Sequence, residues 1–325
     1  MKEEQGEKDM KVKFHLPGLR ANFPVNMLLV DMIKQVPEYF REGLEIASFF
    51  GEFPTSKWNG GRFNGGDQCS AEFVRQVIKA INAEGIPIRF TYTNPLITEE
   101  DLADPYCNFC LLEANNGMNE VIVVSPLLEE YIRECYPDYK ITSSTCKEIK
   151  DIDELNAELD KDYNLVVLDY NLNHDFDLLK QIKKKEKCEL LVNACCVPNC
   201  PRRGEHYRFV AKQEEICLAN RNLPADKQIE MPTWYCEYGE KSSLYIKKNN
   251  PTNISPDEIW NTYVPMGFNQ FKLEGRSANI FLLIDTYAYY FAKPEYRDEV
   301  RFMLTTNLQA NKVITVSKPR KEVWP

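Results

Sequence analysis

Residues 120–143 read EVIVVSPLLEEYIRECYPDYKITS. An apolar run occupies 120–124, a Ser-Pro pair follows it, an amphipathic stretch fills 126–135, and a second run occupies 139–143. Short apolar runs of this kind predict buried strands, and Ser followed by Pro before an amphipathic stretch is typical of a helix start. The segment therefore predicts a strand, a helix and a second strand in succession, the unit from which parallel sheets are built.

The same unit recurs along the chain. Residues 71–83 form another helix candidate, and the predicted strands lie at 12–16, 45–50, 86–93, 120–124, 139–143, 164–169, 188–193 and 268–273. Eight such units predict a single closed (β/α)8 barrel of the TIM type. An open, doubly wound sheet is the competing arrangement, but it normally carries Gly-x-Gly-x-x-Gly after its first strand, and this sequence has no such motif.

The predicted barrel extends over 12–305, with tails at 1–11 and 306–325. Its last part, 278–291 and 294–304, is expected to form two closing helices. The interval between the seventh and eighth strands, 195–267, is longer than one helix requires and is rich in proline, so we expect an elaborated loop region there.

Composition narrows the possible functions. The chain has 325 residues, of which 43% are hydrophobic and 27% charged, which excludes a disordered segment. A formal net charge of -9 disfavours non-specific binding to nucleic acid. No apolar run is long enough to cross a membrane, and the charged N-terminus lacks the apolar core of a signal peptide, so we expect a cytoplasmic protein. The 11 cysteines then indicate metal binding or thiol chemistry rather than disulfides.

In a barrel of this type the active site is formed where the strands end. The residues that follow the predicted strands are polar, and we interpret Ser125, Ser143 and Ser144 as helix caps. Glu52, Asn193 and Glu274 are instead candidates for the site, because a partly desolvated carboxylate is suited to proton transfer. Lys272, Glu274 and Arg276 alternate along one face of the eighth strand, either as part of the site or as an ion-pair network that closes the barrel. The full set of strand-end residues is Glu52, Asn94, Ser125, Ser143, Ser144, Asp169, Asn171, Asn193, Lys272, Glu274 and Arg276.

The cysteines of the 195–267 region suggest a metal centre. Four thiolates that reach one point hold a [4Fe-4S] cluster, or a zinc ion in a site without redox chemistry. Adjacent side chains of an extended chain point in opposite directions, so only one of Cys195 and Cys196 is expected to be a ligand, and we select Cys196. The predicted ligands are Cys196, Cys200, Cys217 and Cys236. The remaining cysteines are interpreted as core residues: Cys69, Cys107, Cys110, Cys135, Cys146 and Cys188.

Two segments resemble the collagenase-like peptidase family U32. One runs from Cys196 to Cys217 and includes Pro-Arg-Arg-Gly-Glu-His-Tyr at 201–207; the other is Gly-Phe-Asn-Gln-Phe-Lys-Leu-Glu-Gly-Arg at 267–276. The resemblance implies a barrel fold. It also implies a [4Fe-4S] cluster, because several members of the family bind one through four cysteines and support oxygen-independent hydroxylation of ubiquinone precursors or of RNA bases. Here the family's Glu-x-Phe-x-x-Gly segment before the first cysteine is replaced by Leu-Leu-Val-Asn-Ala at 190–194, so the substrate stays open.

Three functions follow as expectations. The first is an iron–sulfur enzyme that hydroxylates or otherwise modifies a small molecule or an RNA base; the second is a peptidase, with His206 as base; the third is a non-catalytic subunit of a heteromeric complex, since some relatives work as heterodimers. In the first, Lys272 and Arg276 bind an anionic group and Glu274 or Glu52 moves protons, with electrons from a donor protein. Arg202, Arg203 and Arg208 form a possible phosphate anchor.

Overall fold

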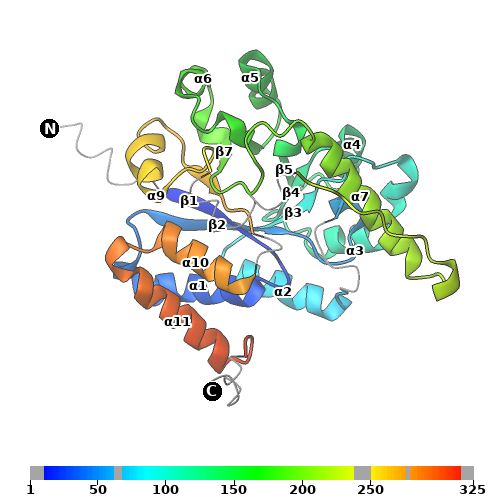
Figure 1. Cartoon of the computed structure of the whole chain (residues 1–325), viewed down its shortest axis with the longest axis horizontal. Coiled ribbons are helices and arrows are strands. Elements are labelled where there is room, and N and C mark those ends of the chain that lie inside the picture. The colour runs from blue at the N-terminus through cyan, green and yellow to red at the C-terminus, as the bar shows by residue number, and fades with distance from the viewer. Residues whose placement is uncertain (1–10, 62–67, 238–249, 276–278, 316–325) are drawn as a thin grey trace. The chain divides into compact units, whose positions relative to one another are not determined.

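The computed structural model describes residues 11–61, 68–237, 250–275 and 279–315 (Figure 1). Within them the chain forms two compact units. One consists of the described parts of 1–20 and 43–277, and the other of the described parts of 21–42 and 278–325.

The first unit is a closed barrel of eight parallel strands in sequence order, which confirms the predicted (β/α)8 fold. Each strand pairs with the next, and β8 pairs with β1 through Phe14 opposite Phe271. The strands are β1 (Val12–Pro17), β2 (Leu44–Gly51), β3 (Ile88–Tyr92), β4 (Glu120–Val123), β5 (Lys140–Ser143), β6 (Leu165–Val167), β7 (Cys188–Leu191) and β8 (Gln270–Lys272). All eight lie at the predicted positions.

Helices connect the strands as the repeated unit predicts. Ser70 Oγ accepts the amide proton of Phe73 and so caps α2, and Ser125 Oγ accepts that of Leu128 ahead of Pro126 in α4. The helices of this unit are α2 (Ala71–Ala83), α3 (Pro105–Glu113), α4 (Pro126–Cys135), α5 (Ile152–Asp160), α6 (Phe176–Gln181), α7 (Arg203–Asn220) and α9 (Pro256–Glu258). Shorter helical turns are η2 (Lys57–Asn59), η3 (Glu99–Ala103), η4 (Thr145–Lys147), η5 (Tyr170–Leu172), η6 (Lys185–Lys187), η7 (Ala225–Lys227) and the π-helical η9 (Ile259–Tyr263).

The second unit is helical. It contains α1 (Phe23–Gln35), η1 (Pro37–Tyr39), α10 (Ile280–Phe291), η10 (Pro294–Tyr296) and α11 (Arg297–Ala310). The buried Tyr287 hydroxyl of α10 donates a 2.5 Å hydrogen bond to Asn26 of α1. The two predicted closing helices are therefore α10 and α11, and the last turn of α11 lies in the segment expected as a tail. No helix in the described ranges is long and apolar enough to cross a membrane.

Charged side chains fill part of the barrel interior. Glu189 of β7 is fully buried and accepts a 2.5 Å hydrogen bond from Arg89 of β3. Lys272 of β8 and His15 of β1 approach the same carboxylate at 3.3 Å each. Burial raises the pKa of Glu189, but Arg89 and the other basic neighbours together outweigh burial and hold that pKa well below its usual range.

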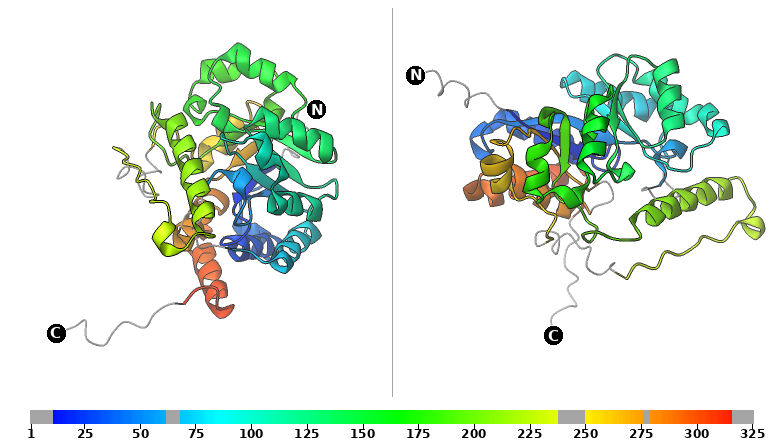
Figure 2. Two further views of the ribbon diagram at one scale, coloured as in Figure 1. Left: turned by 90° about the vertical axis from the view of Figure 1, so that its right-hand side faces the viewer. Right: turned by 90° about the horizontal axis from the view of Figure 1, so that it is seen from above.

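The region between β7 and β8 contains one long helix and its return. After α7, the chain passes through η7 and runs back beside the helix as an extended segment, 228–237, as the yellow-green ribbon in Figure 2 shows. We call this segment the return segment. The predicted loop elaboration thus consists of α7, the return segment, α9 and η9 within the described residues.

Candidate functional site

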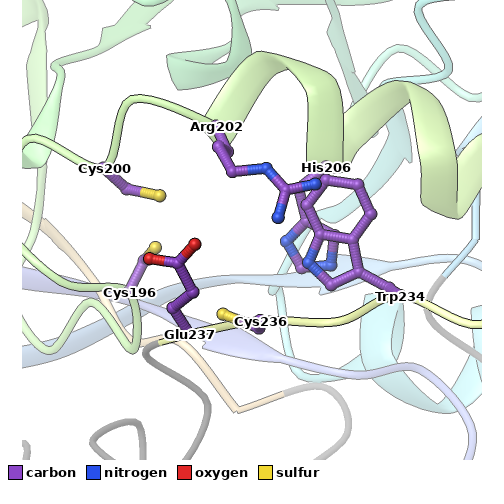
Figure 3. Close-up of a pocket in the computed structure, with 7 residues that line it drawn as sticks. All are labelled: Cys196, Cys200, Arg202, His206, Trp234, Cys236 and Glu237. Carbon is purple, nitrogen blue, oxygen red and sulfur yellow. The ribbon is translucent and has the colours of Figure 1, made fainter.

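Three thiols share a small cavity beyond the end of β7. The cavity has a volume of about 30 Å³. In Figure 3 the sulfur atoms of Cys196 and Cys200 point toward one another, and the sulfur of Cys236 points toward the same space. The complete lining is Cys196, Cys200, Arg202, His206, Trp234, Cys236 and Glu237.

The first turn of α7 is anchored next to this cavity. The buried Arg203 guanidinium forms a 2.8 Å ion pair with Asp169, after β6, and donates a 2.8 Å hydrogen bond to the Thr145 carbonyl. It also lies over the ring of Tyr170, 4.4 Å from the centroid. Because its guanidinium is buried and paired with Asp169, Arg203 is not the phosphate anchor that the sequence suggested together with Arg202 and Arg208.

The local environment disfavours the thiolate form of Cys196. Burial raises the pKa of Cys196, the neighbouring Tyr170 acts in the opposite direction, and the nearby Cys200 raises the pKa further. A metal binds such thiols by displacing their protons. Among the described residues, no three His, Cys, Asp or Glu side chains already stand at the distances needed to hold an ion, so binding requires side-chain rotation within the cavity.

Cys217 lies away from the other predicted ligands. It is on α7, about three turns beyond His206, which corresponds to about 16 Å along the helix axis. The structure therefore brings together Cys196, Cys200 and Cys236 but not Cys217. His206, which was expected as a catalytic base, lines the cavity from the first turn of the helix.

Cys195 and Cys196 face different partners. The Cys195 amide and thiol donate to the Glu274 carboxylate at 2.5 and 2.9 Å, whereas Cys196 lines the cavity. Asn193 holds the backbone of Glu274 in two hydrogen bonds, accepting from its amide at 2.6 Å and donating to its carbonyl at 3.0 Å. These contacts join the ends of β7 and β8 and fix a carboxylate one residue away from the thiol cavity.

The other predicted polar residues have separate environments. Lys272 belongs to the interior charge cluster, with its ammonium 4.1 Å from the centroid of the Phe50 ring. Glu52, after β2, is 8% exposed and accepts a 2.7 Å hydrogen bond from Asn59. Arg276 lies outside the described residues.

Known proteins resemble this chain over much of its length. The protein named "Uncharacterized protease MJ1657", from Methanocaldococcus jannaschii, is 25% identical over 182 residues, which make up 53% of this chain and 49% of that protein. The alignment thus spans about half the length of the relative. The structure of the U32 peptidase Mk0906 superposes with a TM-score of 0.46 and 14% identity, covering 82% of this chain and 94% of that one. The sequence matches no protein-family model.

The two matched proteins are named as a protease and a U32 peptidase, in line with the resemblance found in the sequence. The fold is established by the strand order of the chain itself, a closed eight-stranded barrel.

The expectation for the remaining cysteines holds for some of them. Cys107, Cys110 and Cys188 are buried, and Cys69 and Cys146 are half-buried. Cys135 was expected in the core and is exposed at the end of α4, so that prediction is wrong. Its place in the last turn of an amphipathic helix, where polar residues alternate with apolar ones, explains the error.

Sequence reasoning missed Trp234 and Glu237, which complete the lining of the cavity. Trp234 precedes Cys236 by two positions in a segment without periodicity, so no pattern marked it. A signal for its partners was present, because Arg202, His206 and Phe209 recur at helical spacing and so share one side of α7.

Proposed function

We propose that this U32 relative binds an iron–sulfur cluster through Cys196, Cys200 and Cys236, and that it carries out an oxygen-independent hydroxylation or a related modification. The observation that supports this is the convergence of three thiols, from two distant parts of the chain, on one cavity beyond β7 (Figure 3). Thiolates are the ligands that iron–sulfur clusters require. His206 and Glu237 are the candidates for the fourth ligand, in place of the distant Cys217.

When bound, the cluster supplies one-electron transfer, and the surrounding residues set the conditions for it. Tyr170 is buried in the apolar cluster against which Cys196 packs, so it excludes water from that side. Glu274 accepts a 2.9 Å hydrogen bond from the Cys195 thiol and is the candidate group for proton transfer adjacent to the cavity. Lys272 already balances Glu189, so its role is to keep the interior charge compensated rather than to bind an anion.

A small molecule or an RNA base is the proposed substrate, by analogy with the family members that modify such groups. The barrel mouth is where a (β/α)8 enzyme binds its substrate, and Glu52 and Glu274 both follow strands that end there. Electrons would come from a donor protein or a second subunit.

A thiol hydrolase is the second candidate, because Cys200 and His206 line the same cavity. Cys195 does not support it. A nucleophilic thiolate is stabilised beside a cation, whereas the Cys195 thiol faces the Glu274 carboxylate.

The test is metal analysis of protein purified without oxygen. We expect broad visible absorption and about four iron and four sulfide ions per chain. Cys200→Ser should abolish both, because it removes one of the converging thiols.

Two matched variants sharpen the result. Cys135→Ser, at an exposed thiol on α4, should retain the metal, and Cys217→Ser should retain it as well because Cys217 lies outside the cavity. Zinc or no metal in the wild type, or full iron content in Cys200→Ser, would overturn the proposal. Peptide hydrolysis by the metal-free wild type, lost in Cys200→Ser, would establish the hydrolase.

A further inference from the structure

The return segment follows one side of α7 through a series of side-chain contacts. Asn220, at the end of the helix, pairs with Ile229 in two hydrogen bonds, donating to its carbonyl at 2.8 Å and accepting from its amide at 2.7 Å. Gln213 donates to the Pro232 carbonyl at 2.7 Å, and Arg202, before the first turn, donates to the Tyr235 carbonyl at 3.0 Å. The segment therefore runs antiparallel to the helix, as both views in Figure 2 show.

The spacing of these contacts follows from the geometry of the two chains. Gln213 and Asn220 are two helical turns apart, about 10 Å. Ile229 and Pro232 are three extended residues apart, also about 10 Å. Because these two distances match, a straight helix can hold the backbone of the extended segment in register between these two contacts.

Trp234 fixes the end of the segment that carries Cys236. Its ring stacks on His206 with centroids 4.9 Å apart and planes 11° from parallel, and it also contacts Phe209 at 4.9 Å. The Arg202 guanidinium lies 4.1 Å from the centroid of the Trp234 ring. These contacts come from Arg202, just before α7, and from the first two turns of the helix, as Figure 3 shows for Arg202 and His206.

We propose that α7 serves as the template for the return segment and that Trp234 is the positioning residue that brings Cys236 to Cys196 and Cys200. This inference rests on the proposed function, because placing Cys236 near the other two thiols serves a cluster that needs the third thiol. The positioning itself requires no metal, because every contact above is made by the chain alone. Trp234 acts through Cys236 and is not itself a ligand.

Thiol proximity in the metal-free, full-length protein tests this inference. Dibromobimane alkylates two neighbouring thiols, and mass spectrometry identifies the linked peptides. We expect a link between the peptide that contains Cys236 and the one that contains Cys196 and Cys200. Trp234→Ala should lower its yield about tenfold, because the stacking and cation–π contacts are lost together.

Two further variants separate positioning from general damage. Trp234→Phe keeps an aromatic ring and should recover most of the link, and Tyr235→Ala, at a side chain 77% exposed, should leave it unchanged. All variants should retain the far-ultraviolet circular dichroism of the wild type. An equal yield in Trp234→Ala and the wild type, or no link in the wild type, would overturn the inference. A link that depends on Trp234 in a protein that never binds iron would support the inference and refute the proposed cluster.

Discussion

Glu189 shows how a full charge is kept inside the barrel. The carboxylate has no exposed surface, yet Arg89, His15 and Lys272 surround it from three other strands. His15 is buried as a neutral ring: burial lowers its pKa to about 3, although Glu189 opposes that shift. Ser48 and Gln270 hold the two ring nitrogens at 2.7 and 3.1 Å. The interior is therefore balanced by one guanidinium and one ammonium rather than by imidazolium.

The buried His15 predicts a pH dependence of stability. Its pKa is about 3 in the folded protein, whereas an exposed histidine ring has a pKa of 6.5, so the unfolded chain binds a proton between these values that the folded protein excludes. Stability should thus fall as the pH drops below about 6.5. Between pH 7 and pH 5 we expect His15 to contribute a loss of about 2 kcal/mol in the free energy of unfolding.

Urea unfolding at both pH values measures this contribution. His15→Gln keeps a hydrogen-bonding side chain of similar size without a titrating group. Between pH 7 and pH 5 its free energy of unfolding should therefore fall by about 2 kcal/mol less than that of the wild type. Equal changes in the two proteins would show that His15 titrates normally in the folded state.

At the scale of elements, α7 depends on close approach to the loop after β2. Gly61 has φ +98°, and a Cβ placed there would lie 2.3 Å from Val210 Cγ1 of α7 and 2.9 Å from the Val210 carbonyl oxygen. A side chain at this position is therefore both strained and blocked by the helix.

Gly61→Ala should displace α7 and destabilise the protein more than Gly85→Ala. Gly85 has φ +73° but no atom within 4 Å of its would-be Cβ, so Gly85→Ala measures the backbone strain alone, of about 1 kcal/mol. We expect Gly61→Ala to cost a further 1–3 kcal/mol, roughly the cost of overpacking. Chemical denaturation of both variants gives the difference, and equal losses would mean that the helix adjusts without cost.

At the scale of the molecule, the positions of the strands could be predicted from the sequence, but the contacts between side chains across the barrel could not. Each strand can be recognised from its own residues, because a buried strand is apolar whichever parts of the chain supply the neighbouring strands. Glu189 and Arg89 are 100 positions apart, and only closure of the barrel brings them together. Both lie within predicted strands. The local sequence does not distinguish a charged residue that points into the barrel from a strand that was wrongly assigned.

The same difference between local and long-range contacts applies to the thiol site. Cys196 and Cys200 are close in sequence, so their proximity was predictable. Cys217 was grouped with them by spacing alone, but a continuous helix separates residues by about 1.5 Å each and carries Cys217 away. Cys236 returns because the segment after η7 reverses direction, which depends on contacts between two elements rather than on either sequence by itself.

Loss of the proposed metal should affect this molecule locally. The barrel closes through backbone hydrogen bonds and a core to which the cavity cysteines contribute little. Hydrogen exchange after treatment with an iron chelator should therefore be unchanged in β1–β8 and faster in 229–237. Faster exchange throughout the barrel would instead make the metal a structural requirement of the fold, as in small zinc domains.

The matched repeats of α7 and the return segment constrain how the length of this region can change. Inserting two turns into the helix moves its far end outward by about 10 Å, which three additional extended residues cover. A change in one element alone would shift Cys236 out of register with Cys200. We therefore expect insertions and deletions here to be tolerated in pairs, about seven residues in the helix with about three in the return segment. The distance between Cys200 and Cys236 then stays constant while α7 and the return segment lengthen or shorten together.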